Sequence, residues 1–500
     1  MEPLRTPIVL ACVGVYMLSC IVVGAWAMRR THSAKDFFVA GRDLGVMVTA
    51  LAVFSSTLSG FGFVGGPGLV YSLGMSSIWM IIASSIGYAL SFFLLGKRIR
   101  LFAELRDSVS LPDAVAARYR SEAARFLTAL AILLGVMGYL ATQILAMATV
   151  LQSVLTRTDT FSQISLGACV TLSCAVLVFY SVAGGIIASV YTDMLQGAVM
   201  VVAALMVLIA AILAVDGGVP AIVDIIAADD REAANPWGTL GMLGTLSWYF
   251  VFALGGAGQP HVVTKLMMNR RVEDARHILP VSILGYSVSA LLWISIGLTM
   301  RALVLSGGHP ELPGADAAAA EFLQHYAHPL LAGVVFAGLF AAIMSTADAF
   351  LNIGAAAVIH DIPRALGSTA IKPERELFWA RVATAVTAVA AAVFAMYSHY
   401  ENQRLVALLG AFGWGTFAAA LVPTVAIGFN WKRASARAAC VAIVSSLVIN
   451  LAIELFKLRL PFGINGGAAS LAVSLTLFFC VSFMGPPPPI DPDVEAVMDL

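Results

Sequence analysis

Long apolar runs recur along the whole chain, and they constrain its fold more than any other feature of the sequence. A membrane core about 30 Å thick is crossed by a helix of roughly 20 apolar residues. Thirteen runs of this kind, separated by short polar segments, occur in the 500 residues. We therefore expect an all-α integral membrane protein with about 13 transmembrane helices. Their expected spans are 8–28, 46–74, 76–96, 126–155, 162–182, 187–215, 240–263, 278–303, 329–359, 378–397, 405–429, 438–455 and 467–484.

Composition excludes several other classes of protein. Hydrophobic residues make up 60% of the chain and charged residues 12%, whereas charged residues are about a quarter of a soluble globular protein. Because 29 basic residues balance 29 acidic ones, we expect no nucleic-acid partner. The six cysteines lie in apolar runs without metal-ligand spacing, which favours neither disulfides nor zinc. No nucleophile, base and orienting group are spaced for catalysis, so we expect no enzyme, and no obligate protein partner is indicated.

The basic residues predict an orientation. When the expected spans alternate across the membrane, most of the 29 lysines and arginines fall on one side, in the connections at 29–45, 97–125, 264–277, 360–377 and 430–437. Basic residues favour the cytoplasmic side of a membrane protein. We therefore expect a multi-pass protein of the plasma (inner) membrane, with the amino terminus outside and the carboxyl terminus in the cytoplasm.

Two of the expected spans are interrupted by residues that break helices. Glycine and proline are dense at 59–68 in the second span and at 255–260 in the seventh. Backbone groups that such breaks free inside lipid must find a partner, a cavity or a ligand. The two spans are five apart, as the first helices of two inverted five-helix units would be. Interrupted segments at matching positions of two halves are typical of the central site of a transporter.

This spacing also divides the chain. We expect an amino-terminal extra helix and cytoplasmic loop at 1–45, a first repeat at 46–215 and an inverted second repeat at 240–429. Two carboxyl-terminal helices follow at 430–484. The proline-rich start of 485–500 favours a disordered cytoplasmic tail.

Polar residues in the middle of apolar spans are candidates for an ion site. Ser345 and Thr346 lie in the ninth span, with Asp348 about one helical turn after Ser345. Hydroxyl and carboxylate oxygens at this spacing are suitable ligands for a small cation. A carboxylate in the centre of a membrane helix costs about 2.5–3.5 kcal/mol, so Asp348 is a functional candidate. Asp193, near the start of the sixth span, is the second intramembrane acid.

Several of these segments resemble the sodium/solute symporter family. The motifs are 36–42 (DFFVAGR), Gly184-Gly185 followed by Thr192-Asp193, 258–261 (GQPH), and 344–346 (MST) followed by His360-Asp361; they occur in the order seen in that family. The resemblance extends over nearly the whole chain, including its length. It implies the leucine-transporter-type fold, a 5+5 inverted repeat with discontinuous helices.

The resemblance also implies an ion site, with Na⁺ as the coupling ion. Carried over residue by residue, the sodium ligands are the carbonyls of Ser55, Leu58 and Ala342 and the hydroxyls of Ser345 and Thr346. Asp193 matches an acidic position on the sodium exit route. Asp193 and Asp348 lie where some relatives hold a second sodium ion.

The solute site carried over from the family is less uniform. It comprises Ser59, Gly60, Phe61, Tyr139, Phe252 and Gly256. Ser59, Gly60 and Tyr139 agree with the proline branch, whereas Phe61 and Phe252 replace tryptophans, Gly256 replaces a tyrosine and Thr57 replaces an aspartate. The run at 63–68 resembles pantothenate carriers instead. Both solutes carry a carboxylate, which the amides near Ser59 and Gly60 could receive.

These features favour a secondary active transporter. We expect sodium-coupled symport of a small organic solute by alternating access, with a carboxylate-bearing solute such as proline or another amino acid as the first hypothesis. A sodium/pantothenate or monocarboxylate symporter is the nearest alternative. A proton-coupled carrier would use Asp348 or Asp193 as its titrating group. A transporter-like receptor would bind solute without accumulating it.

Overall fold

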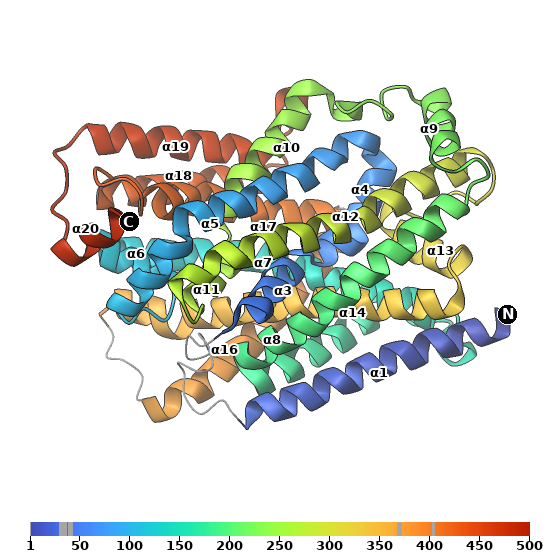
Figure 1. Ribbon diagram of the computed structural model, residues 1–500, viewed down its shortest axis with the longest axis horizontal. Coiled ribbons are helices and arrows are strands. Elements are labelled where there is room, and N and C mark those ends of the chain that lie inside the picture. The colour runs from blue at the N-terminus through green and yellow to red at the C-terminus, as the bar shows by residue number, and fades with distance from the viewer. Residues whose placement is uncertain (1, 30–37, 39–43, 368–372, 403–405) are drawn as a thin grey trace.

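The long helices of the molecule run side by side and form a bundle (Figure 1). The computed structural model describes residues 2–29, 38, 44–367, 373–402 and 406–500, and every regular element longer than a single bridge in those ranges is helical. The first half contains α1 (Glu2–Met28), α3 (Val46–Thr57), η2 (Phe61–Gly65), α4 (Gly66–Leu73), η3 (Gly74–Ile78), α5 (Trp79–Leu105), α6 (Leu111–Tyr119), α7 (Glu122–Leu155), α8 (Leu166–Leu213) and α9 (Gly218–Asp229).

The second half continues the same pattern. It contains α10 (Gly241–Gly255), η6 (Gly256–Gly258), α11 (Pro260–Met267), α12 (Ala275–Leu305), α13 (Ala318–His325), α14 (Pro329–Ala356), η9 (Ala357–Asp361), α15 (Ile362–Ala365), α16 (Pro373–Asn402), α17 (Val406–Leu421), η10 (Val422–Ile427), α18 (Ala436–Leu455), α19 (Gly466–Phe483) and α20 (Pro492–Met498). Short 3₁₀ turns are η4 (Asp159–Phe161), η5 (Gly238–Leu240), η7 (Val272–Asp274), η8 (Ala315–Ala317) and η11 (Pro461–Gly463).

Among the described residues, 11 helices are long and apolar enough to cross a membrane. The expected number of about 13 is therefore not confirmed. The difference has two sources: the second and third expected spans merge into the candidate Phe61–Leu105, preceded by the short helix Val46–Thr57, and the fifth is the short helix Leu166–Phe179. The chain is a multi-pass membrane protein.

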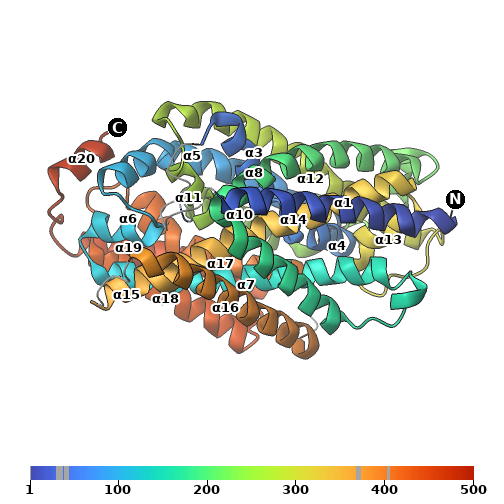
Figure 2. The same cartoon turned by 90° about the horizontal axis from the view of Figure 1, so that it is seen from below.

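The two ends of the chain lie at opposite ends of the bundle in both views (Figures 1 and 2). An odd number of membrane crossings places the termini in this way. The arrangement agrees with the expected 13 spans, because that number is odd.

Both predicted helix interruptions are confirmed. The first follows Thr57, where α3 ends and the chain continues through the π-helical turn η2 into α4. The second follows Gly255, where η6 and the extended residue Gln259 separate α10 from α11. Pro260 occupies the first turn of α11, where its missing amide hydrogen leaves no helical bond unmade.

The interruptions are surrounded by the most deeply buried helices. Nearly all of α14 is buried, and α1, α7 and α8 pack against it. The outer helices instead expose large apolar side chains, such as Leu18 of α1, Val393 of α16 and Phe483 of α19. In a membrane protein these side chains face lipid, because lipid is as apolar as they are.

A buried ionic cluster holds α6 against the end of α14. Asp113 of α6 accepts hydrogen bonds from Arg125 and from His360 Nε2, the latter at 2.8 Å, and Ser110 Oγ donates to Asp361 Oδ1 at 2.6 Å. Burial alone would raise the pKa of Asp113, but the hydrogen bond and positive charge of His360, with the nearby guanidiniums, hold it well below its usual range. Because Arg125 and His360 both pair with Asp113, the cluster acts as an ion-pair network around this carboxylate.

The carboxyl-terminal segment differs from the expected disorder. Its helix α20 buries Val494 and Met498 and packs near α5. Arg106 forms ion pairs with Asp491 at 2.9 Å and Asp493 at 2.7 Å. The acidic residues of the tail therefore find basic partners at the end of α5, a complementarity that its proline-rich start does not indicate.

Candidate ion and solute site

The final turns of α3 end at the centre of the bundle, and they form the core of the candidate site. Residues 52–57 are all buried. A helix that ends leaves its last carbonyl groups without amide partners from a following turn. The amide of Leu58 satisfies one of them by donating to Phe54 O at 3.0 Å. The carbonyl of Ser56 instead accepts a hydrogen bond from Thr346 of α14.

Hydroxyl groups of α14 meet this end of α3. Ser345 Oγ lies 3.5 Å from Ser55 Oγ. Thr346 Oγ1 contacts Ser56 O at 2.7 Å and Ala342 O at 3.1 Å. The structure thus brings together four of the residues expected to bind sodium, with Leu58 directly after the end of α3.

The acid Asp193 lies in the same region, paired with a residue that the sequence analysis did not select. Lys265 Nζ donates to Asp193 Oδ2 at 2.9 Å and to Ala52 O at 2.7 Å. Lys265 belongs to α11 and is fully buried, so its assignment to a polar connection at 264–277 was wrong. A lysine four residues after His261, inside a half-helix that follows a break, is the signal that could have identified it.

Asp348 is the second buried acid of the cluster. It follows Ser345 by one turn of α14, and its Oδ2 atom has no hydrogen-bond partner in the described part of the chain. The same is true of Asp193 Oδ1. Two buried carboxylate oxygens with unused acceptor capacity therefore lie close to the hydroxyls of the candidate ion site, where a cation would satisfy them.

The break after α3 continues into the residues expected to bind solute. Ser59 Oγ accepts from the amide of Phe61 at 3.1 Å and lies 3.2 Å from the hydroxyl of Tyr139. The Gly60 amide donates to Gln143 Oε1 at 2.7 Å. Gln143, on α7 with Tyr139, was not selected from the sequence, because one glutamine in an apolar helix gives no distinctive pattern. Gln143 accepts the hydrogen bond of the Gly60 amide, and this is the amide that we expected to bind a solute carboxylate.

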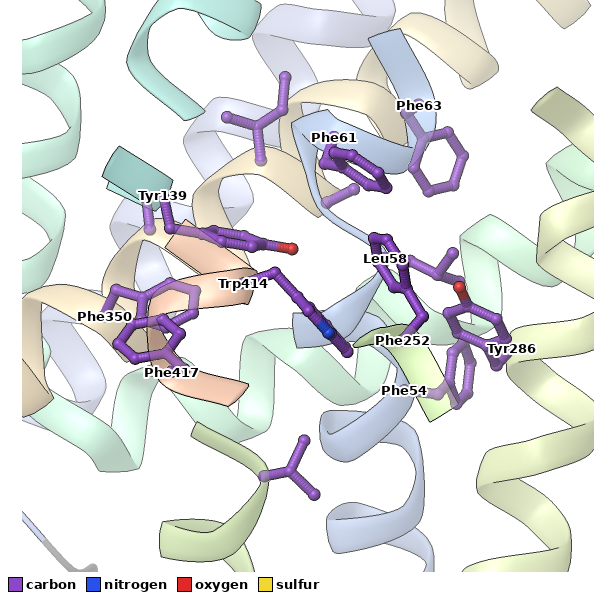
Figure 3. Packing of buried hydrophobic residues seen from close by; sticks show 14 of the residues in the cluster. Phe54, Leu58, Phe61, Phe63, Tyr139, Phe252, Tyr286, Phe350, Trp414 and Phe417 are labelled. Atoms are coloured by element: carbon purple, nitrogen blue, oxygen red, sulfur yellow. The ribbon is translucent and has the colours of Figure 1, made fainter. Parts of the chain in front are cut away.

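Aromatic rings close over this break. Phe61 and Phe252 stack with their ring centroids 5.9 Å apart, and Phe252 stacks on Trp414 at 5.0 Å. Trp293 meets Phe61 edge to face at 6.3 Å. Figure 3 shows Phe61, Phe252 and Trp414 converging near Leu58, with the Tyr139 hydroxyl pointing toward the same region. The rings form an apolar wall beside the polar groups of Ser59 and Gly60.

Gly256 occupies a different position from the other expected solute ligands. A Cβ atom added to Gly256 would lie 2.5 Å from the Cα atom of Gly87 on α5. The backbone of Gly256 also accepts a hydrogen bond from Ser91 Oγ at 2.7 Å. Gly256 therefore permits a close crossing between α5 and the break after α10.

One expected motif cannot be placed in this way. The segment 36–42 lies outside the described residues except for Phe38, which is buried beside Leu44.

Comparison with known proteins identifies the family to which the chain is similar. The model of the sodium:solute symporter family matches residues 37–445. The osmoregulated proline transporter OpuE of Bacillus subtilis is 26% identical, over 87% of this chain and 86% of its own. The sodium/proline symporter of Staphylococcus aureus is also 26% identical, over 98% of this chain and 95% of its own.

Solved structures agree with this fold. A Na⁺-coupled sialic acid symporter in a substrate-bound outward-open state superposes with a TM-score of 0.77 at 20% identity, over 97% of this chain and 99% of that chain. A nucleobase-cation-symport-1 family transporter in a closed conformation superposes with a TM-score of 0.57 at 15% identity, over 93% of this chain and 98% of that chain. The expected leucine-transporter-type fold is confirmed.

The close crossing at Gly256 generates a stability prediction. Gly256→Ala should lower the free energy of unfolding by about 1–3 kcal/mol, because the new methyl group overlaps the backbone of Gly87. Thermal denaturation of the purified protein in detergent should show a lower midpoint. The matched control is Gly14→Ala on α1, where no atom lies within 4 Å of the added Cβ and the midpoint should not fall. An unchanged midpoint for Gly256→Ala would contradict the assigned role.

Proposed function

This chain belongs to the sodium:solute symporter family, and from that premise we propose that it imports a small carboxylate-bearing solute together with sodium. The observation that carries the proposal is the meeting of two hydroxyl-bearing residues of α14 with the interrupted end of α3. No covalent chemistry is part of this function. The sodium ion is a substrate that crosses the membrane with the solute.

The proposed sodium ligands are all oxygen atoms. They are the carbonyls of Ser55, Leu58 and Ala342 and the hydroxyls of Ser345 and Thr346. Small hard cations prefer oxygen ligands of this kind. A hydroxyl group has two acceptor lone pairs as well as one hydrogen. Thr346 can therefore accept a sodium ion while its hydrogen stays on a backbone carbonyl.

The proposed solute site lies immediately beyond the ion. The Ser59 hydroxyl and the Gly60 amide would receive the carboxylate, with Gln143 giving up its bond to that amide. Phe61 and Phe252 would cover the apolar part of the solute, and Tyr139 would orient Ser59. Because two relatives are named for proline transport, proline is the first solute to test.

Coupling follows from the position of the ion. In this proposal 46–215 and 240–429 form the two inverted halves, so that α3 belongs to one and α14 to the other. A sodium ion bound by both would hold the halves in one arrangement and order the break at Ser59 and Gly60. Each sodium ion contributes about 2.3 kcal/mol per 100 mV, and each tenfold gradient about 1.4 kcal/mol. One ion could sustain a solute ratio of several hundredfold, an order-of-magnitude figure from the same values.

We also propose the orientation that the basic residues indicate, with the amino terminus outside and the carboxyl terminus in the cytoplasm. Reassigning Lys265 to a buried helix removes one residue from the cytoplasmic side and leaves the bias in place. The ion pairs between Arg106 and the acidic tail lie on the proposed cytoplasmic side.

The primary test is uptake into vesicles that contain the purified protein. Labelled proline should accumulate with an inward sodium gradient and not with a choline gradient, because the proposed oxygen ligands suit a small hard cation and not the bulky choline ion. Competition by unlabelled pantothenate and small monocarboxylates would rank the alternative solutes. Accumulation driven by a pH gradient alone would contradict sodium coupling and support a proton carrier, and binding without accumulation would support a receptor.

A second prediction concerns the ion ligands. The double variant Ser345→Ala with Thr346→Ala should raise the half-saturating sodium concentration of uptake about tenfold or more, because two ligands are lost. Thr384→Ala is the matched control, since Thr384 makes the same hydrogen bond to the carbonyl four residues earlier but lies on α16. Its sodium dependence should match the wild type. A double variant with unchanged sodium dependence would show that the assigned site is wrong.

A further inference from the structure

We propose that the ammonium group of Lys265 is a fixed second cation of the ion site, so that one mobile sodium ion binds beside it. This inference rests on the proposed sodium coupling and assigns its stoichiometry. Asp193 was expected to lie where some relatives hold a second sodium ion. In this inference Lys265 neutralises Asp193, so that no second ion is needed there.

The position of Lys265 is defined by three separate helices. The side chain extends from α11, donates to Asp193 on α8 at 2.9 Å and donates to the carbonyl of Ala52 on α3 at 2.7 Å. Lys265 and Asp193 are both fully buried. Two short hydrogen bonds therefore hold the ammonium group in one position inside the protein.

The ammonium group lies beside the proposed sodium ligands. Ala52 precedes Ser55 by about one turn of α3, a rise of roughly 5 Å along the helix. The Asp193 carboxylate that binds Lys265 also lies near the hydroxyl of Ser345, which faces Ser55. A backbone carbonyl and a carboxylate oxygen are ligands that an alkali cation would use. Lys265 therefore takes oxygen ligands of the type that a second sodium ion would need.

Charge balance limits the number of mobile ions. Among the described residues of this cluster, Asp193 and Asp348 are acidic and Lys265 is basic, which leaves one negative charge when all three are ionised. An unbalanced charge in a buried site is strongly destabilising. One sodium ion would balance the cluster, whereas two would leave it with an excess positive charge. His261 lies on the same helix as Lys265 and contacts Thr57 through Nε2, and a histidine adds no negative charge to the cluster.

Unused carboxylate oxygens show where the negative charge that balances the mobile ion lies. Asp193 Oδ1 and Asp348 Oδ2 are buried and have no hydrogen-bond partner within the described ranges. The other oxygen of Asp193 is occupied by Lys265. Removal of the ammonium group would free this second oxygen and the Ala52 carbonyl, and would leave a second negative charge to be balanced.

The test is the number of sodium ions that the purified full-length protein binds. Equilibrium binding of radiolabelled sodium needs no solute, so it is independent of substrate identity. We expect one ion per wild-type chain and two per Lys265→Met chain. Adding Asp193→Asn to Lys265→Met should return the number to one, because the unbalanced carboxylate is removed as well. Lys432→Met is the matched control on the surface, where Lys432 pairs with Glu495, and it should bind one ion.

Three outcomes separate the inference from the function on which it rests. Two ions bound by the wild type would overturn the inference without the use of any variant. One ion bound by Lys265→Met would also overturn it, provided that the variant elutes and melts as the wild type does. No sodium bound by the wild type would instead contradict the proposed sodium coupling itself.

Discussion

The ending of α3 inside the bundle is the constraint on which the rest of the structure depends. A helix in lipid satisfies its own backbone groups, and a helix that stops there leaves carbonyls and amides that cost several kcal/mol each if they stay unpaired. Here the partners come from two neighbouring helices: Thr346 on α14 bonds the Ser56 carbonyl, and Gln143 on α7 bonds the Gly60 amide. The polar side chains in otherwise apolar spans therefore have a structural reason, and the same groups form the candidate site.

This arrangement places the ion and the solute within a few residues of each other. Ser55 and Leu58 are proposed ion ligands, and Ser59 and Gly60, the next residues along the chain, are proposed solute ligands. Any movement of the backbone at Leu58 would therefore move both the proposed ion ligands and the proposed solute ligands. Coupling can then arise from local order, because a cation that fixes the end of α3 also fixes the amides that follow. The aromatic wall of Phe61 and its neighbours makes this region apolar, and charges interact more strongly in apolar surroundings than in water.

The interruptions and the hydroxyls of α14 could be predicted from the sequence, because glycines, prolines and adjacent hydroxyls are conspicuous in apolar runs. Lys265 could not be placed in the same way. It lies near the end of an apolar run, where a lysine is as compatible with a cytoplasmic connection as with a buried ion pair, and only the position of Asp193 distinguishes the two. Gln143 gave no pattern at all. The ordered tail was missed because its ion pairs join Arg106 to residues almost 400 positions later.

The central claim is that one cation bound between α3 and α14 orders both the ion site and the adjacent break. Hydrogen exchange of the purified protein, followed by mass spectrometry in sodium and in choline, tests it without knowledge of the solute. Sodium should slow exchange in two segments together, 55–65 after the end of α3 and 342–348 on α14, and should leave the distant α18 and α19 unchanged. Equal exchange of both segments in sodium and choline would contradict the account.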